Sequence, residues 1–327
     1  MTGLEEWILC MDIGGTNIRA GMIDRDFNLS SFVLADSPSI LTGEASFTNL
    51  SNFIRRYIQE HAGNSYPIAI SLGFPATIDK AKKCVVSAPN VNGINNIPIV
   101  DLLQAEYNIP VFIDRDVNMC VCYDMYKLNL ESDGIIIACY LGTGFGNALW
   151  INGSIYSGYS GSAGELGHIP VLGKIDICGC GNKGCIEHYT SGKQLENIQS
   201  TYFPETDISD LFEYHSDEAV VEKFIEAISI PIATEINILD PEYVILGGGV
   251  IHMKGFPNDK LERFIRMHTR KPYPNKTLRI RYSIQKQENG VIGAGIYAFE
   301  QLEKENKGFN DFEKLRKKEW DNDCTRK

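Results

Sequence analysis

The sequence predicts an α/β protein of two domains. Its 327 residues are enough for about two domains, each able to bury a core of its own. Apolar stretches of strand length are followed by segments whose apolar residues recur at a helical period. A unit made of a strand, a glycine-rich turn and a second strand occurs near the start of the chain and again after residue 134. This repetition favours a duplicated architecture.

The first half is expected to open with a β-hairpin, because apolar stretches over 7–13 and 18–23 flank the turn at 14–17. A helix is predicted over 46–60, where apolar residues follow a period of about 3.6. Two more strands, over 67–72 and 111–113, end at Gly-Phe-Pro-Ala (73–76) and Asp-Arg-Asp (114–116).

The second half repeats this pattern. A strand over 135–141 leads into a glycine-rich turn at 142–146 and a return strand over 147–151. A helix over 217–237 and a strand over 243–246 follow. No low-complexity linker separates the halves, so we expect two closely joined domains. The charged tail from Gln301 onward suits a solvated helix.

Composition excludes several classes of protein. The formal net charge of −11 disfavours broad attraction to nucleic acid or an anionic membrane. No run approaches the roughly 20 apolar residues that span a bilayer, and the N-terminus lacks the basic region of a signal peptide. Nine cysteines are too sparse for a disulfide scaffold in a chain of this length. We therefore expect a cytoplasmic protein that binds neither nucleic acid nor membrane.

Three glycine-rich turns, each directly after an apolar strand, predict a nucleotide site. Glycine lets backbone N–H groups approach a phosphate closely, and an acidic residue at a strand end can hold Mg²⁺. Each turn alone could be an ordinary connection between strands, and none is followed by the Gly-Lys-Ser/Thr of a Walker A loop. The candidate ATP and Mg²⁺ residues are Asp12, Gly14, Gly15, Thr16, Asn17, Gly142, Thr143, Gly144, Gly247, Gly248 and Gly249.

A histidine and three cysteines have the spacing of a metal site: His168, Cys178, Cys180 and Cys185. One imidazole and three thiolates form a complete tetrahedral set for structural Zn²⁺, with no position left for a catalytic water. The alternative is three unconnected thiols and a surface histidine.

Four carboxylates lie beside these features in the sequence: Asp114, Asp116, Glu165 and Glu187. Carboxylates bind sugar hydroxyls directionally, and one of them can take the proton from a hydroxyl that attacks a phosphate. Each could instead be a helix cap or a surface charge. Glu165 and Glu187 flank the candidate metal ligands, which would fix both on one platform.

Several segments together resemble the ROK (repressor, open reading frame, kinase) family. They are Asp-Ile-Gly-Gly-Thr-Asn (12–17), Asp-Val-Asn (116–118), Leu-Gly-Thr-Gly-Phe-Gly (141–146), Ala-Gly-Glu-Leu-Gly-His (163–168), Cys-Gly-Cys-Gly-Asn-Lys-Gly-Cys-Ile-Glu (178–187), Gly-Gly-Gly-Val (247–250) and Gly-Ala-Gly (293–295). The resemblance runs from about residue 8 to 300, and its His/Cys segment is the most specific part.

The resemblance implies an actin-like ATPase fold of ribonuclease-H-like type, with a cleft between two α/β domains. It implies domains over 1–115 and 116–294, the first completed by a helix at about 295–327. It implies an ATP-dependent hexose kinase in which Asp116 is the general base. The implied sugar contacts are Ala76, Asn90, Arg115, Asp116, Glu165, His168 and Glu187, and His168 also binds zinc.

Two departures from the family pattern bear on the sugar. Arg115 stands where the family usually has an asparagine that contacts a sugar hydroxyl, and Ala76 stands where a glycine is usual. We expect Arg115 to recognise a hydroxyl group of the sugar; the alternative is a salt bridge to Asp114. Gly-Phe-Pro-Ala, Arg-Asp-Val-Asn and Gly-Glu-Leu-Gly-His-Ile-Pro look most like the bacterial allose kinases of the family. The resemblance therefore implies D-allose, phosphorylated at the 6-hydroxyl.

Other functions stay open. Glucokinase, fructokinase and N-acetylmannosamine kinase are alternatives within the family. A ROK transcriptional repressor would carry a helix-turn-helix domain before the sugar domain, and with the phosphate segment at residue 12 we expect none. A sugar sensor without catalysis would not need Asp116 and both phosphate turns. A homodimer is implied only by the habit of the family.

Overall fold

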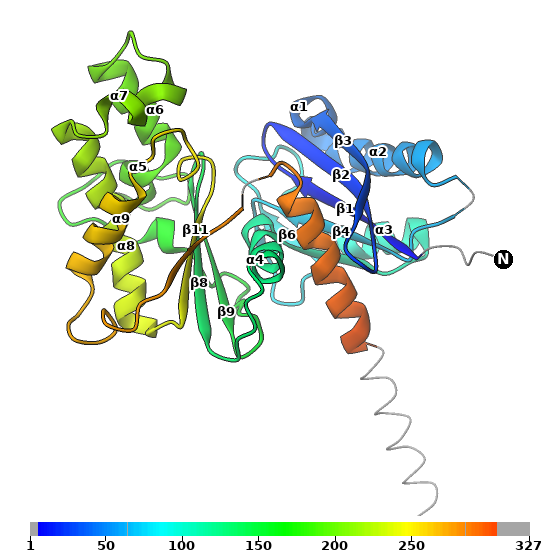
Figure 1. Ribbon diagram of the computed structural model, residues 1–327. Coiled ribbons are helices and arrows are strands. Elements are labelled where there is room, and N and C mark those ends of the chain that lie inside the picture. The colour runs from blue at the N-terminus through cyan, green and yellow to red at the C-terminus, as the bar shows by residue number, and fades with distance from the viewer. Residues whose placement is uncertain (1–5, 64, 285, 306–327) are drawn as a thin grey trace, which may run out of the picture.

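Two five-stranded mixed sheets form the two domains of the computed structural model, which describes residues 6–63, 65–284 and 286–305. Figure 1 shows the two sheets side by side, each with its own helices. Each has a separate buried apolar cluster. The α/β class with two domains is confirmed.

The first sheet has the strand order β3-β2-β1-β4-β7. β1, β2 and β3 form an antiparallel meander, and β4 and β7 run parallel to β1. Its strands are β1 (Trp7–Ile13), β2 (Asn17–Asp24), β3 (Leu29–Asp36), β4 (Ala69–Phe74) and β7 (Val111–Arg115), and its helices are α1 (Ser37–Ile40), α2 (Ser46–His61) and α3 (Ile99–Tyr107). A small hairpin of β5 (Thr77–Ile78) and β6 (Val85–Ser87) follows β4.

The second sheet has the order β10-β9-β8-β11-β12, which is the same pattern in chain order: third, second, first, fourth, fifth. Its strands are β8 (Ile135–Leu141), β9 (Phe145–Ile151), β10 (Ser154–Ile155), β11 (Tyr243–Gly247) and β12 (Ile280–Tyr282). Its helices are α5 (Glu187–Thr190), α6 (Gly192–Tyr202), α7 (Leu211–His215), α8 (Ala219–Leu239) and α9 (Asn258–His268). The duplicated architecture inferred from two strand–turn–strand units is therefore confirmed.

Two helices lie between the sheets, α4 (Asp116–Lys127) after β7 and a helix over 289–305 after β12 (Figure 1). A buried cluster containing Ile8 of β1, Val121 of α4 and Ile136 of β8 joins both sheets to these helices. A Cβ atom at position 293 would overlap the backbone carbonyl of Met119, so only glycine permits the two helices to approach this closely. The two domains therefore share a packed core.

Most predicted elements are present, with small shifts of their ends. The predicted helix over 46–60 is Ser46–His61, and the predicted strand over 67–72 is Ala69–Phe74. The sequence analysis did not identify several elements, among them β3, α3, α4, α6, α9 and β12. The boundary between residues 115 and 116 stays a prediction. The C-terminal helix begins at 289, earlier than the predicted 295, and the predicted part over 306–327 lies outside the described residues.

Of the helices formed by the described residues, none combines the length and apolarity needed to cross a bilayer.

Candidate functional site

The candidate site begins at the edge of the first sheet where β1, β4 and β7 end. Asp12 of β1 is the register partner of Gly73 in β4, and Gly73 is the partner of Asp114 in β7. Since parallel strands end at one edge, this pairing brings residues far apart in sequence into one row. Asp116 starts α4 two residues beyond Asp114. The predicted Mg²⁺ ligand and the predicted base thus lie at the same edge.

Asp12 and Asp116 influence each other electrostatically. Burial raises the pKa of Asp12 to about 6, the negative charge of Asp116 adds to the rise, and the nearby Arg19 opposes it. Burial also raises the pKa of Asp116. Two groups oppose this rise: the backbone N–H of Val117, which donates to Oδ1 at 2.8 Å, and the positive charge of Arg115. A carboxylate whose pKa lies nearer to neutral is a better proton acceptor at cellular pH.

The first glycine turn is closed by its own backbone and backed by a loop. The Gly14 N–H donates to the Asn17 carbonyl at 2.9 Å. A Cβ atom on Gly15 would lie 2.7 Å from the Asn90 carbonyl oxygen, so the Asn90 loop lies directly against this turn. Ala76 follows β4, and its side chain packs on the first core. Asn90, a predicted sugar contact, thus also lies against the predicted phosphate turn.

The second glycine turn is backed by a carboxylate. Glu187 accepts the N–H of Phe145 through Oε2 at 2.8 Å, and a side chain on Gly144 would overlap that carboxylate. Gly142 closes the turn by donating to the Gly144 carbonyl at 3.0 Å. The predicted sugar residue Glu187 is therefore tied to the predicted phosphate turn.

The third glycine run lies beside the second turn. Gly248 has φ +92° and packs against the backbone of Leu141, the last residue of β8, so a side chain would not fit there. The Val250 N–H donates to the Leu141 carbonyl at 2.9 Å. Gly247 packs on Tyr140, whereas Gly249 faces open space. The two runs predicted to bind nucleotide in the second domain are thus adjacent.

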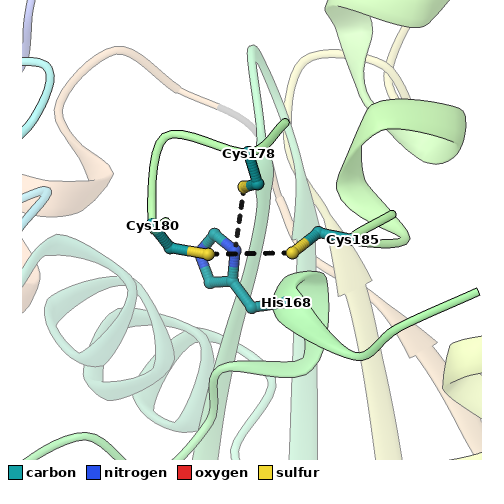
Figure 2. A group of neighbouring side chains, drawn as sticks. All are labelled: His168, Cys178, Cys180 and Cys185. Carbon is teal, nitrogen blue, oxygen red and sulfur yellow. Dashed lines mark hydrogen bonds between the residues drawn. The ribbon is translucent and has the colours of Figure 1, made fainter. Parts of the chain in front are cut away.

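The four predicted zinc ligands converge, as Figure 2 shows. Their ligand atoms all lie within 4.8 Å of one another. Sγ of Cys178 is 3.5 Å from Nδ1 of His168, and Sγ of Cys180 is 3.7 Å from Sγ of Cys185. Two thiolates bound tetrahedrally at about 2.3 Å from Zn²⁺ would be about 3.8 Å apart. The residues therefore fit one tetrahedral ion, and the alternative of unconnected thiols is wrong.

The predicted zinc ligand His168 also contacts a predicted sugar residue, Glu165. Its Nε2 is 3.6 Å from Oε2 of Glu165, while its Nδ1 faces the thiols. A carboxylate on the second ring nitrogen commonly orients a metal-bound histidine. Arg115 approaches the same carboxylate from the other side, with Nη2 3.1 Å from Oε1. The three predicted sugar contacts Arg115, Glu165 and His168 therefore form one chain.

The alternative role given to Arg115, a salt bridge to Asp114, is wrong. Asp114 instead pairs with Lys82, whose Nζ is 2.5 Å from Oδ2, and only the backbone N–H of Arg115 donates to Asp114. Sequence reasoning missed Lys82, which is 32 residues from its partner. It also missed Arg19, whose Nη1 is 3.2 Å from Oδ2 of Asp12. Arg19 faces Asp12 across the predicted hairpin, a signal that could have identified it.

Comparison with known proteins places the chain in a family. The ROK family model matches residues 8–301. An N-acetyl-D-glucosamine kinase of Histophilus somni is 30% identical over 73% of this chain and 82% of its own length. A glucokinase of Halalkalibacterium halodurans is 27% identical over 93% of this chain and 98% of its own.

A solved structure agrees. The ROK hexokinase of Thermus thermophilus superimposes with a TM-score of 0.73 at 26% identity, covering 91% of this chain and 99% of that one. This likeness confirms the actin-like ATPase fold that the sequence resemblance implied. The chain therefore belongs to the ROK family and is one of its sugar kinases, which are phosphotransferases.

Proposed function

We propose that this protein transfers the γ-phosphoryl group of ATP to the 6-hydroxyl of a hexose of glucose configuration, either D-glucose or N-acetyl-D-glucosamine. The names of the relatives favour these two sugars over the others considered. The expectation of D-allose finds no support among the relatives compared. The observation that carries the proposal is the position of Asp116, a half-buried carboxylate at the start of α4 beside Asp12, whose pKa is raised by desolvation.

In this mechanism Asp116 accepts the proton of the attacking hydroxyl as the bond to phosphorus forms. The backbone N–H groups of the turns at 14–17 and 142–144 bind the phosphates, and Gly247 to Gly249 receive the adenosine. Asp12 would hold Mg²⁺, whose charge neutralises the phosphates when it is bound. Its carboxylate is one-fifth exposed and lies at the same edge as Asp116, which suits this role.

The sugar is held by Glu165, His168 and Glu187, carried on the segment that the zinc ligands fix. Structural Zn²⁺ would stabilise this segment without taking part in proton transfer. From the first domain, Asn90 and the backbone at Ala76 would border the sugar, since the Ala76 side chain packs on the first core. The eight described cysteines are unpaired, which suits the reducing cytoplasm, and the homodimer stays a prediction.

A coupled ADP-release assay across D-glucose, N-acetyl-D-glucosamine, N-acetyl-D-mannosamine, D-fructose and D-allose tests the proposal. We expect the highest kcat/KM with glucose or N-acetylglucosamine, and sugar-dependent turnover only when ATP and Mg²⁺ are both present. NMR of the product locates the phosphate. A preference for D-allose by more than about tenfold, equal to about 1.4 kcal/mol, would overturn the proposed substrate.

A further inference from the structure

Arg115 links the two domains through its side chain. It ends β7 of the first sheet and is only 7% exposed. Its Nη1 donates to the Ala163 carbonyl at 2.6 Å, and its Nη2 donates to the Gly164 carbonyl at 3.3 Å. Nη2 also pairs with Oε1 of Glu165 at 3.1 Å. A residue of the first domain thus binds three consecutive residues of the second.

The segment bound by Arg115 is enclosed from its other side by β9. Gly164 has φ +81°, and a Cβ atom there would lie 2.7 Å from the Asn147 carbonyl and 3.3 Å from Nη1 of Arg115. Asn147 is held in turn by Glu235 of α8, which accepts from Nδ2 at 2.9 Å. Residues 163–165 therefore lie between a strand and a guanidinium, with no room for a side chain at position 164.

The chemistry of this contact requires arginine. A guanidinium is a planar, permanently charged group that only donates, so it can serve two carbonyls and one carboxylate at fixed angles. A lysine at this position would offer a point charge without that fork. Because the donors of Arg115 are directed at protein acceptors, they do not depend on a bound sugar. This geometry differs from the hydroxyl-reading role expected from the sequence.

We propose that Arg115 is a positioning residue that acts on the sugar through Glu165, fixing the orientation of that carboxylate from the first domain while His168 fixes it from the metal cluster. The inference rests on the proposed sugar site and deepens it. Glu165 would then present its free lone pairs to the sugar in one orientation, and only when the two domains are in contact. Sugar affinity then depends on a residue that makes no hydrogen bond to a sugar hydroxyl itself.

A double-mutant cycle tests this coupling. Arg115→Met should raise the KM for the sugar by roughly tenfold or more, about 1.4 kcal/mol, with the KM for ATP changed less than about threefold. In a Glu165→Gln background the same substitution should add less than about threefold, because the group through which it acts is already gone. Independent, multiplicative effects of the two substitutions would overturn the proposal.

Two further readouts separate positioning from a merely structural role. Arg115→Ala should regain sugar affinity with added guanidinium but not with methylammonium, and Arg115→Lys should remain impaired. Removing the positive charge should also shift the acid limb of the kcat/KM profile to higher pH, because Arg115 lowers the pKa of Asp116. An unshifted profile together with failed rescue, in variants that keep their zinc and fold, would contradict the inference.

The pair Arg55 and Glu106 provides the matched control, since it is also an arginine–glutamate contact but joins α2 to α3 and includes none of the proposed site residues. Arg55→Met and Glu106→Gln should leave the KM values unchanged. If the wild-type protein phosphorylates none of the sugars, the proposed function fails. The Arg115–Glu165 coupling is then still measured by thermal unfolding of the four proteins of the cycle, where additive Tm changes would overturn it.

Discussion

The two glycine turns occupy equivalent places in two sheets of the same strand order, but different groups support them. The turn after β1 is backed by a backbone carbonyl, that of Asn90. The turn after β8 is backed by the carboxylate of Glu187, which accepts the Phe145 N–H. A backbone carbonyl has a fixed position, whereas a carboxylate can move and carries charge. The duplicated frame thus provides two glycine turns, and the second is joined to Glu187 by a side-chain hydrogen bond.

The source of this difference is the connection after the third strand of each sheet. In the first domain, β3 is followed by the short helix α1 and then by α2. In the second, β10 is followed by a long segment over 156–191 that carries Glu165, the four candidate zinc ligands and Glu187. Three of the residues proposed to hold the sugar, Glu165, His168 and Glu187, therefore lie where the two halves do not correspond.

The largest effect is expected at Asp116, the proposed general base. Asp116→Asn should lower kcat by about 10²–10⁴-fold, the usual contribution of a positioned base, with little change in the KM for the sugar. Steady-state kinetics on protein with an unchanged Tm measures this. Turnover close to that of the wild type would mean that the base lies elsewhere.

Substitution of one glycine in each turn compares their supports directly. Gly15→Ala should raise the KM for ATP by roughly tenfold, because its Cβ would lie 2.7 Å from a backbone carbonyl that cannot rotate away. Gly144→Ala should mainly raise the KM for the sugar, because the flexible Glu187 side chain would be displaced.

Gly179→Ala, which adds a methyl group in open space within the zinc segment, is the control and should change neither KM. Equal effects of Gly15→Ala and Gly144→Ala on both substrates would show that the two turns are functionally alike.

Loss of zinc should destabilise the second domain and weaken sugar binding by the residues of that domain. Cys180→Ser should reduce the zinc content from about one ion per chain to a small fraction, lower Tm by at least about 5 °C and raise the KM for the sugar. Cys84→Ser, at a half-buried thiol of the first domain, is the control and should keep its zinc. Elemental analysis of fresh wild-type protein that finds no zinc would contradict the site.

The smallest effect is expected at Asp12, and it is a gain in stability. The folded-state pKa of about 6 lies above the usual 3.8, so the folded protein favours the protonated carboxyl. The corresponding stability is present below pH 4 and is lost as the pH rises through 6. Asp12→Asn imitates the protonated form. It should therefore raise Tm by a few degrees, about 2–4 °C per kcal/mol, at pH 7.5 without ligands, while activity falls.

The Tm difference between Asp12→Asn and the wild type should shrink as the pH is lowered towards 4. A difference that is constant across this range would contradict the assigned pKa shift, since a pH-independent effect cannot come from titration of Asp12.

The sequence alone determined the α/β class, the duplicated strand units and the metal-ligand set. These are local signals: the apolar period of each strand, the glycines that a tight turn requires, and the donor types that zinc prefers. The predicted strand over 135–141 and the helix over 217–237 are found with ends shifted by two residues at most. The four predicted metal ligands, His168 and the three cysteines, also lie together, because they come from one stretch of 18 residues.

Only the tertiary structure decided which charges pair. Arg115 could pair with its neighbour Asp114 as far as sequence distance is concerned, yet Lys82 takes that carboxylate and Arg115 crosses to Glu165, fifty residues away. Ion-pair partners are selected by which side chains the packed domains bring within reach, and sequence separation carries no information about that contact. The hydrogen bond from the Phe145 N–H to Glu187 could not be predicted for the same reason, because it requires β8, β9 and α5 to be packed together.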